Sequence, residues 1–331
     1  MRKPDFFIVG APKCGTSAMA HYLSAHPDIF LARKEMHVFG QDLRFSPQFY
    51  RRDLSTYLSE FDKWEGQKRG GEASVWYLYS TQAAAEIKAF NPDARIIIML
   101  RDPVEMAHSL YHQFRYDRNE QLGTFEEALE AEADRRAGGR VGRRAYFADG
   151  LRYHDVGAYT EQIRRYFDVF GRERVHMVVY DDFATNAAAA CRATLDFLEI
   201  DSKALPRQFK VVNPAKVVRH PALHAVMHEP LLRKAALAIR PLVPRRVFSW
   251  LQSIDDALRR RSTGVAERPL LAMETRQQLK RDFAPEVARL SELLNRDLTH
   301  WSSVDWRAPL RESQWIALRR NAIFSASSPQ T

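Results

Sequence analysis

The fold is decided near the start of the chain by the stretch Phe6-Phe7-Ile8-Val9-Gly10-Ala11-Pro12-Lys13-Cys14-Gly15-Thr16-Ser17. The four apolar residues at its beginning predict a short buried strand, and a helix is expected over residues 18–26. The glycine-containing turn between them, residues 10–17, can point successive backbone N–H groups at an anion, and the helix that follows adds its positive end. The order of strand, turn and helix therefore predicts an anion-binding loop.

Two further strands have the same character. Residues 94–100 are apolar apart from Arg95 and lead into Arg101-Asp102-Pro103, and residues 175–180 are apolar apart from His176 and lead into Asp181-Asp182. Unbroken apolar strands are typical of a parallel sheet covered by helices on both faces. Helices are expected over residues 81–90, 104–115, 159–170, 187–198, 273–283 and 285–298. This alternation predicts an α/β fold with a doubly wound parallel sheet.

The length and the local composition predict the domain organisation. The chain has 331 residues, enough for one large α/β domain. We expect a single domain over residues 1–324, with insertions near 117–150 and 219–262 and a flexible tail at 325–331. The first insertion begins as an acidic helix and becomes rich in Arg and Gly, whereas the second is basic and amphipathic. Loops and insertions over a rigid sheet commonly carry binding specificity.

Composition narrows the class of protein. Hydrophobic residues make up 45% and charged residues 27%, as in soluble globular proteins, and the formal net charge of +9 favours anionic ligands. No apolar run reaches the ~18 residues of a membrane span, and no early segment reads as a signal peptide. The two cysteines, Cys14 and Cys191, cannot build a disulfide framework. The sequence thus predicts a cytoplasmic protein.

The turn at residues 10–17 differs from the nucleotide-triphosphate loop, G-x-x-x-x-G-K-[ST], in the place of its cation. Gly10, Gly15 and Ser17 occupy the matching positions, but Thr16 stands where that loop has its lysine. Lys13 supplies a cation in the middle of the turn instead. From there it can reach a bridging oxygen between a terminal group and a phosphate. Cys14 is predicted to be a small spacer because no base lies beside it in sequence.

The stretch from Pro12 to Ser17 resembles the 5′-phosphosulfate loop of sulfotransferases that use 3′-phosphoadenosine 5′-phosphosulfate. Arg101-Asp102-Pro103-Val104, followed by Ser109 and Tyr111, resembles the 3′-phosphate element of the same family. Further similar stretches are Glu72-Ala73-Ser74 with Tyr77, Tyr180-Asp181-Asp182-Phe183, and Leu294-Asn295-Arg296-Asp297-Leu298 with Trp301. The pattern is most similar to bacterial and heparan-type carbohydrate sulfotransferases. The resemblance implies a P-loop-NTPase-like sulfotransferase fold and in-line transfer of a sulfo group to a hydroxyl or amine.

The resemblance also implies the donor contacts. The predicted contacts to the phosphosulfate are Lys13, Cys14, Gly15, Thr16, Ser17 and Ala18. Arg101 stands at the carboxyl end of a strand, where α/β sheets bind ligands, and Ser109 follows about two helical turns later, so both are expected on the 3′-phosphate. Many relatives add a K-G-R-like loop, for which the candidates here are Arg261 and Arg268, although Thr263 and Val265 replace its flanking basic residues.

Four residues are predicted to perform the chemistry or to contact the acceptor. Lys13 would stabilise charge on the leaving phosphate, and no metal is required. Lys34-Glu35-Met36-His37-Val38-Phe39 resembles the K-E-x-H-F-F stretch of heparan-type enzymes, which implies Glu35 as the general base, with cations lowering its pKa. His37 is the rival base, the role that histidine has in cytosolic aryl and steroid sulfotransferases. Glu35, His37 and Glu72 are the predicted acceptor contacts, but Ala73 replaces a lysine of the heparan-type enzymes.

Two other functions stay open at this level. A nucleotide kinase or other P-loop NTPase is one, because residues 175–182 imitate a strand that ends in magnesium-holding acids. A module for anionic ligands or membranes is the other, using residues 219–261 and 135–144, and peripheral membrane contact could also accompany catalysis. No nucleic-acid partner is expected. The acceptor is expected to be a carbohydrate, a glycolipid or a small natural-product alcohol, and the sequence does not specify an oligomeric state.

Overall fold

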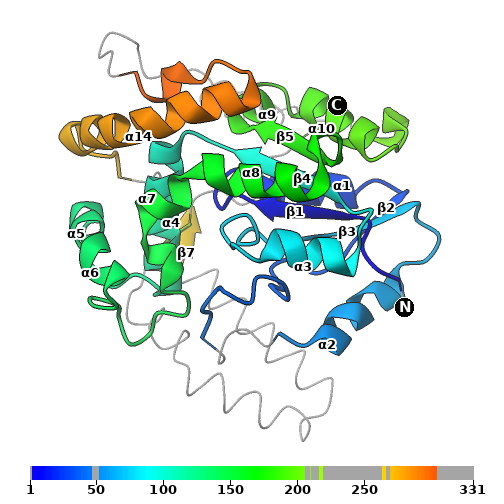
Figure 1. The fold of residues 1–331 in the computed structure, drawn as a ribbon, viewed down its shortest axis with the longest axis horizontal. Helices are drawn as coiled ribbons and strands as arrows, with labels where there is room; N and C mark the ends of the chain where they lie inside the picture. Colours follow the sequence, from blue (N-terminus) through cyan, green and yellow to red (C-terminus); the bar gives the residue numbers. More distant parts are fainter. Residues whose placement is uncertain are drawn as a thin grey trace, which may run out of the picture.

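The computed structural model describes residues 2–46, 52–205, 209 and 269–303, together with the backbone of residues 216–218 and 263–265. Its centre is a five-stranded sheet in which all neighbouring strands run parallel (Figure 1). The strand order is β2 (Ile29–Leu31), β3 (Arg69–Ala73), β1 (Phe6–Gly10), β4 (Arg95–Leu100) and β5 (Val175–Val179). The chain first extends the sheet on one side of β1 and then on the other. This reversal is the mark of a doubly wound sheet, so the predicted fold class is confirmed.

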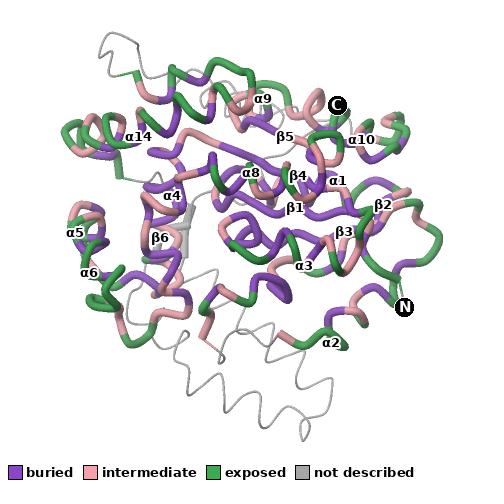
Figure 2. Tube along the Cα trace, in the orientation of Figure 1, coloured by how far each residue is buried: buried purple, intermediate pink, exposed green. Residues whose placement is uncertain are grey.

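Helices cover both faces of the sheet because the crossovers between parallel strands are right-handed and change direction at β1. Helix α1 (Thr16–Ser24) packs against α10 (Ala187–Phe197), and α3 (Ala83–Phe90) packs against α8 (Tyr159–Phe170). Strand β1 is buried at every residue and β4 at all but its first, as the unbroken apolar runs predict. Figure 2 shows this buried layer inside a partly exposed shell of helices.

The remaining elements surround this core. The helices are α2 (Leu54–Ser59), α4 (Pro103–Asp117), α5 (Phe125–Glu130), α6 (Glu132–Arg136), α7 (Tyr153–Gly157), α9 (Tyr180–Thr185) and α14 (Met273–Leu294). Short 3₁₀ helices occur at Glu60–Lys63, Asp149–Leu151, Arg172–Arg174, Ser202–Ala204 and Thr299–Trp301. Strands β6 (Lys216–Val218) and β7 (Thr263–Val265) form an antiparallel pair, and β6 packs against α4.

Two strands of the sheet, β2 and β3, are absent from the sequence prediction. Strand β3 reads Arg-Gly-Gly-Glu-Ala, which has no apolar run. Its glycines make room for aromatic neighbours, because a Cβ at Gly71 would lie 2.3 Å from Phe6 Cζ and a Cβ at Gly70 would lie 2.5 Å from Trp64. The apolar surface of this strand is therefore supplied by rings from elsewhere in the chain, which a local pattern cannot reveal.

The prediction of two helices over residues 273–283 and 285–298 is also wrong. The structure has one helix, α14, which runs through Pro285 and ends at Leu294. Buried apolar residues on both sides of the proline, Phe283 and Val287, keep one face of the helix packed. Asn295 adopts the left-handed conformation with φ of 48°, which ends the helix.

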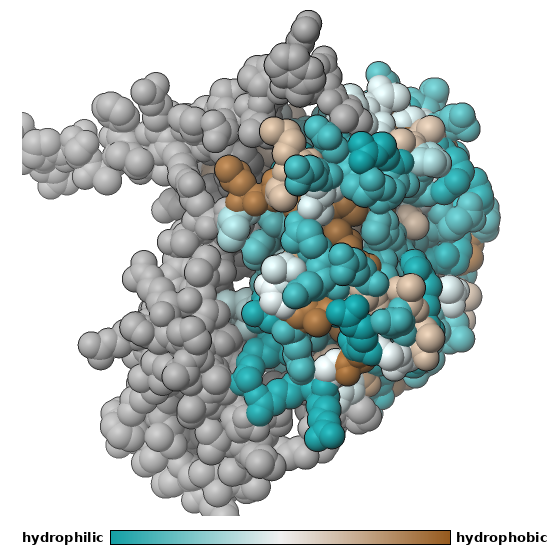
Figure 3. Space-filling model, turned by 90° about the vertical axis from the view of Figure 1, so that its left-hand side faces the viewer, coloured by the Kyte–Doolittle hydropathy of each residue, from teal (hydrophilic) through white to brown (hydrophobic). Residues whose placement is uncertain are grey.

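Residues 117–150, which the sequence predicts to be an insertion, contain α5, α6 and the segment that follows them. A buried ion pair anchors it: Arg135 Nη2 lies 2.9 Å from Glu120 Oε1, with both side chains 1% exposed. Tyr153 donates a hydrogen bond to the other carboxylate oxygen of Glu120. Figure 3 shows a mainly hydrophilic surface among the described residues on this side of the molecule.

Other predictions on domain organisation are not tested by the structure. Residues 219–262 and the tail at 325–331 lie outside the described residues, so the single domain over residues 1–324 stays a prediction. Among the described residues, no helix combines the length and the apolar character that crossing a membrane requires.

Candidate active site

The turn after β1 has the geometry of an anion-binding loop. Gly15 has a φ of 90° and directly precedes α1, so the chain enters the helix from a left-handed residue. A Cβ at this position would also lie 3.1 Å from Tyr180 Cδ2. Glycine therefore satisfies both the backbone and the packing here. The first amides of α1, at Thr16 and Ser17, begin the helix where a bound anion would lie.

Lys13 connects this turn to α4. The residue itself has a left-handed φ of 62°, and its Nζ donates to Gln113 Oε1 over 3.0 Å. Ser109 lies four residues before Gln113 and hence on the same face of the helix. The Ser109 hydroxyl is buried and has no hydrogen-bond partner in the described part of the chain. The Lys13 ammonium and a buried donor on α4 thus lie along one helix face.

Arg101 lies at the carboxyl end of β4, as predicted. Its guanidinium sits over the ring of Tyr180, 4.9 Å from the centroid, and its Nη2 is 3.5 Å from Glu105 Oε2. The other oxygen of Glu105 accepts a hydrogen bond from Arg276 of α14. Burial alone would raise the pKa of Glu105, but Arg276 and Arg101 together lower it. Two guanidinium groups therefore converge on one carboxylate, one helical turn from Ser109.

Arg276 is a residue that sequence reasoning missed. It is one of many basic residues on an amphipathic helix, and its sequence neighbours give no motif. The predicted carboxyl-terminal contacts, Arg261 and Arg268, lie outside the described residues. The backbone of β7, which lies between them in sequence, pairs with β6 beside α4.

The turn and the Arg101 region lie at the same edge of the sheet. The amide of Ala11 donates to Met99 O over 2.7 Å, which ties the start of the turn to the end of β4. Cys14 is fully buried between them, with its Sγ 3.9 Å from the Tyr159 hydroxyl. Burial raises the pKa of the Cys14 thiol to about 12. A thiol with that pKa stays protonated, consistent with a spacer rather than a nucleophile.

Glu35 and His37 lie beside the carboxyl end of β3 in an unusual backbone conformation. Both are left-handed, with φ values of 60° and 47°. The Glu35 amide donates to Ala73 O over 2.8 Å, and the His37 amide donates to Ser74 Oγ over 3.2 Å. Such a conformation costs of order 1–3 kcal/mol per residue and persists where surrounding contacts impose it. Here the end of β3 supplies those contacts.

The Glu35 carboxylate is held by three groups. Its Oε2 is 3.0 Å from His37 Nε2 and accepts a hydrogen bond from the Val75 amide over 3.2 Å. Its Oε1 is 3.6 Å from Lys34 Nζ. Burial alone would raise the pKa of Glu35, but His37, Lys34 and the Val75 amide outweigh it and lower the pKa. The carboxylate is therefore ionised at neutral pH and able to accept a proton.

Exposure separates the two predicted bases. The Glu35 side chain is 33% exposed, whereas His37 is 1% exposed and stacks on Phe45 with ring centroids 4.8 Å apart. An acceptor hydroxyl can reach Glu35 from solvent, while His37 faces inward and orients the carboxylate. The geometry favours Glu35 as the base and His37 as its positioning partner.

Glu72 lies deeper than an acceptor contact would. It is fully buried on β3, among Ser74, Tyr77 and Tyr57. Burial raises the pKa of Glu72 to about 8, so the carboxyl group is mostly protonated at neutral pH. The structure brings it near Glu35 but gives it no exposed surface, and its contact with an acceptor stays a prediction.

The two acids after β5, which the NTPase interpretation would place on magnesium, are engaged elsewhere. Asp181 Oδ2 accepts a hydrogen bond from Trp301 Nε1 over 2.8 Å. Asp182 forms a two-bond ion pair with Arg296 at 2.5 and 2.8 Å. Both acids thus attach the chain after α14 to α9.

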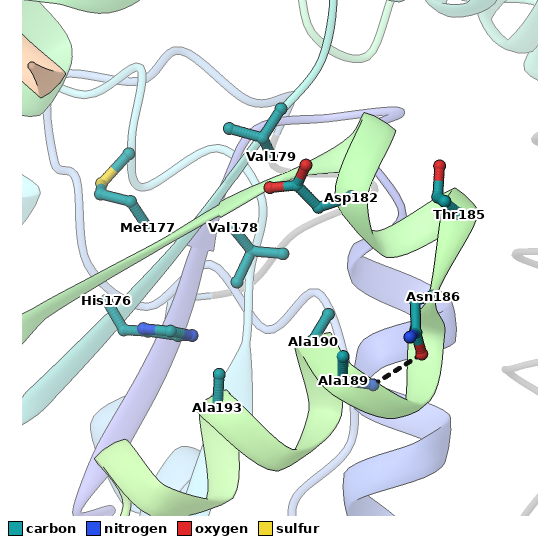
Figure 4. Close-up of a pocket in the computed structure, with 10 residues that line it drawn as sticks. All are labelled: His176, Met177, Val178, Val179, Asp182, Thr185, Asn186, Ala189, Ala190 and Ala193. Atoms are coloured by element: carbon teal, nitrogen blue, oxygen red, sulfur yellow. Dashed lines mark hydrogen bonds between the residues drawn. The ribbon is translucent and has the colours of Figure 1, made fainter. Parts of the chain in front are cut away.

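Two hollows lie away from Lys13, Glu35 and His37. The first, about 360 Å³, lies between β5 and α10 and is mostly apolar, with His176, Met177 and three alanines of α10 among its lining (Figure 4). Burial lowers the pKa of His176 to about 4, so its ring is neutral. The second, about 510 Å³, is polar and includes Arg152 and Arg165. Neither is lined by the predicted catalytic residues.

Comparison with known proteins now identifies the family. A family model described as "Sulfotransferase domain" matches residues 3–224. A solved sulfotransferase from Alicyclobacillus acidocaldarius is 30% identical, with a TM-score of 0.68 over 92% of this chain and 100% of that one.

Curated relatives match over shorter stretches. The membrane-associated sulfotransferase kil1 of Dictyostelium discoideum is 30% identical over 33% of this chain and 22% of its own length. Human heparan sulfate glucosamine 3-O-sulfotransferase 6 is 32% identical over 34% of this chain and 31% of its own length. The chain thus spans less than a third of either curated relative. The family match and the full-length structural relative agree with the geometry above, and the chain belongs to the sulfotransferase domain family.

Proposed function

We propose that the protein transfers a sulfo group from 3′-phosphoadenosine 5′-phosphosulfate to a hydroxyl or amine acceptor. The observation that carries the proposal is the meeting of two anion-binding elements at one edge of the sheet. Lys13 of the turn after β1 is bonded to the face of α4 that also carries Ser109. One elongated ligand with a phosphate at each end suits this arrangement better than a single anion.

The two ends of the donor would be held by different groups. The turn residues from Lys13 to Ala18 would surround the phosphosulfate. Arg101 and the unpartnered Ser109 hydroxyl would hold the 3′-phosphate. Arg276 joins them in this proposal because it already shares the carboxylate of Glu105 with Arg101. Arg261 and Arg268 stay as predicted additional contacts.

The chemistry would proceed by in-line transfer. Glu35 takes the proton of the acceptor hydroxyl, and the acceptor oxygen forms a bond to sulfur. The bond between sulfur and the bridging phosphate oxygen breaks, and its electron pair stays on 3′-phosphoadenosine 5′-phosphate. Lys13 stabilises the charge that develops there. No step of this scheme requires a metal ion.

The acceptor is proposed to be a carbohydrate or glycolipid hydroxyl, with a small natural-product alcohol as the next choice. The name of the human relative supports a sugar acceptor. Ala73, in place of the lysine of heparan-type enzymes, argues against contacts like theirs to a sulfated polysaccharide. Cytoplasmic location and peripheral membrane contact remain predictions.

Two measurements test the proposal. Isothermal titration calorimetry should show binding of 3′-phosphoadenosine 5′-phosphate without added metal. A screen with radiolabelled donor against sugar, lipid, phenol and peptide acceptors should then find label transferred to one class. Magnesium-dependent ATP turnover, with no binding of the adenosine bisphosphate, would support the NTPase interpretation instead.

A further inference from the structure

Lys34 lies between the donor turn and Glu35. Its Nζ donates to Ser17 Oγ over 2.8 Å and lies 3.6 Å from Glu35 Oε1. The side chain is 26% exposed, so most of its length is covered. One ammonium group therefore contacts the first turn of α1, where the sulfated end of the donor is proposed to bind, and the group proposed to activate the acceptor.

The position is chemically unusual for a surface lysine. Burial lowers the pKa of Lys34, although the Glu35 carboxylate partly restores it. Ser17 needs no cation for its own stability, since a hydroxyl can bond to backbone or water.

We propose that Lys34 is a second catalytic cation, which contacts the sulfo oxygens while the group passes from the donor to the acceptor. This inference rests on the proposed function. An ammonium group has three N–H donors, so Lys34 can keep Ser17 and Glu35 as partners and offer the third to the sulfo group. Lys13 would stabilise the leaving phosphate, and Lys34 would stabilise the sulfo group during its transfer.

The product and the intact donor should depend on Lys34 to different degrees. 3′-Phosphoadenosine 5′-phosphate lacks the sulfo group, so Lys34 should contribute little to its binding. The intact donor carries the sulfo group, so transfer should depend on Lys34. A role limited to holding the turn in shape would instead weaken both in the same proportion.

The test compares Lys34→Met and Lys34→Arg with wild type. For Lys34→Met we expect sulfo transfer to fall about 10- to 100-fold, the value of one charge-assisted hydrogen bond, with the affinity for 3′-phosphoadenosine 5′-phosphate unchanged. Transfer is read as release of that product from the donor, with the screened acceptor or water. Lys68→Met is the matched control, because Lys68 is 63% exposed and pairs with Asp28 away from the site.

A pH profile gives the second readout. The titratable groups that face Glu35 are Lys34, His37 and, from β3, Glu72. Loss of the Lys34 charge raises the pKa of Glu35, so the acidic limb of the rate should move to higher pH in Lys34→Met but not in Lys34→Arg. Unchanged transfer, an unmoved limb, or equal losses of transfer and product binding would each overturn the inference. If wild type itself neither binds the product nor transfers sulfo groups, the proposed function fails first.

Discussion

The turn after β1 and the helix after β4 would hold opposite ends of one donor, yet they are built by different means. The turn is made of backbone, with Lys13 and Gly15 in the left-handed conformation just before α1. The helix is made of side chains at four-residue spacing, with Glu105, Ser109 and Gln113 on one face. Backbone conformation sets the positions of the anion-binding groups in the turn. The spacing of residues along the helix sets those positions in α4. Catalysis is expected to depend on the first, and nucleotide selection on the second.

The largest effect should come from the strained segment beside the turn. For Glu35→Gln we expect transfer to fall about 10²- to 10⁴-fold, because the amide cannot accept the acceptor proton. The pKa of Glu35 is lowered by His37 and Lys34, so wild-type activity should stay level through neutral pH and fall only in acid. Rate measurements from acidic to neutral pH check this. His37→Asn is the comparison: if it abolishes transfer while Glu35→Gln does not, His37 is the base.

Lys13→Ala tests the turn itself. We expect transfer to fall about 10²- to 10³-fold, the usual cost of removing one group that stabilises a developing negative charge. The fold should persist, since the Lys13 ammonium contacts Gln113 rather than the core. Transfer assays and thermal unfolding of the same preparation distinguish a loss of catalysis from a loss of the fold. Full activity in this variant would contradict the assigned role.

Features that depend on local sequence are predictable, whereas features that depend on tertiary contacts are not. Strands β1, β4 and β5 are predicted correctly because each consists mainly of apolar residues. Strand β3 escapes prediction because Gly71 admits the ring of Phe6 from a neighbouring strand. The positions of Arg101 and Ser109 at a strand end and two turns into a helix follow from regular geometry, so a motif is enough to find them.

Other parts of the site depend on tertiary contacts. The left-handed conformation of Glu35 and His37 is supported by hydrogen bonds to Ala73 and Ser74, and it is uncommon for a residue such as Glu35. Arg276 reaches the site from α14, more than 170 positions along the chain from Glu105, through a contact that only the folded protein reveals.

Arg276→Met tests the helical region by ligand selectivity. We expect the affinity for 3′-phosphoadenosine 5′-phosphate to fall about 10- to 100-fold, since a charged hydrogen bond to the 3′-phosphate is lost. The affinity for adenosine 5′-phosphate should not change, and titration calorimetry with both ligands measures the ratio. Arg281→Met is the control, because Arg281 lies on the same helix but bonds to Gln278 at the surface. Equal losses for both ligands would assign Arg276 a structural role.

The smallest effect is expected at the end of β5, where acids follow the strand but serve a different purpose. Asp182 pairs with Arg296, and both side chains are more than a third exposed, so Asp182→Asn should cost at most about 1 kcal/mol of unfolding free energy. Arg296 lowers the pKa of Asp182. The ion pair therefore stabilises the fold above the pKa that Asp182 has in the unfolded chain. This stabilisation is lost as the pH falls through the lower pKa that Asp182 has in the folded protein. Wild type and variant should converge in thermal unfolding at low pH, while transfer at neutral pH stays equal. A large loss of transfer in this variant would mean that the end of β5 also contacts a ligand, and that the donor site is not confined to the ends of β1 and β4.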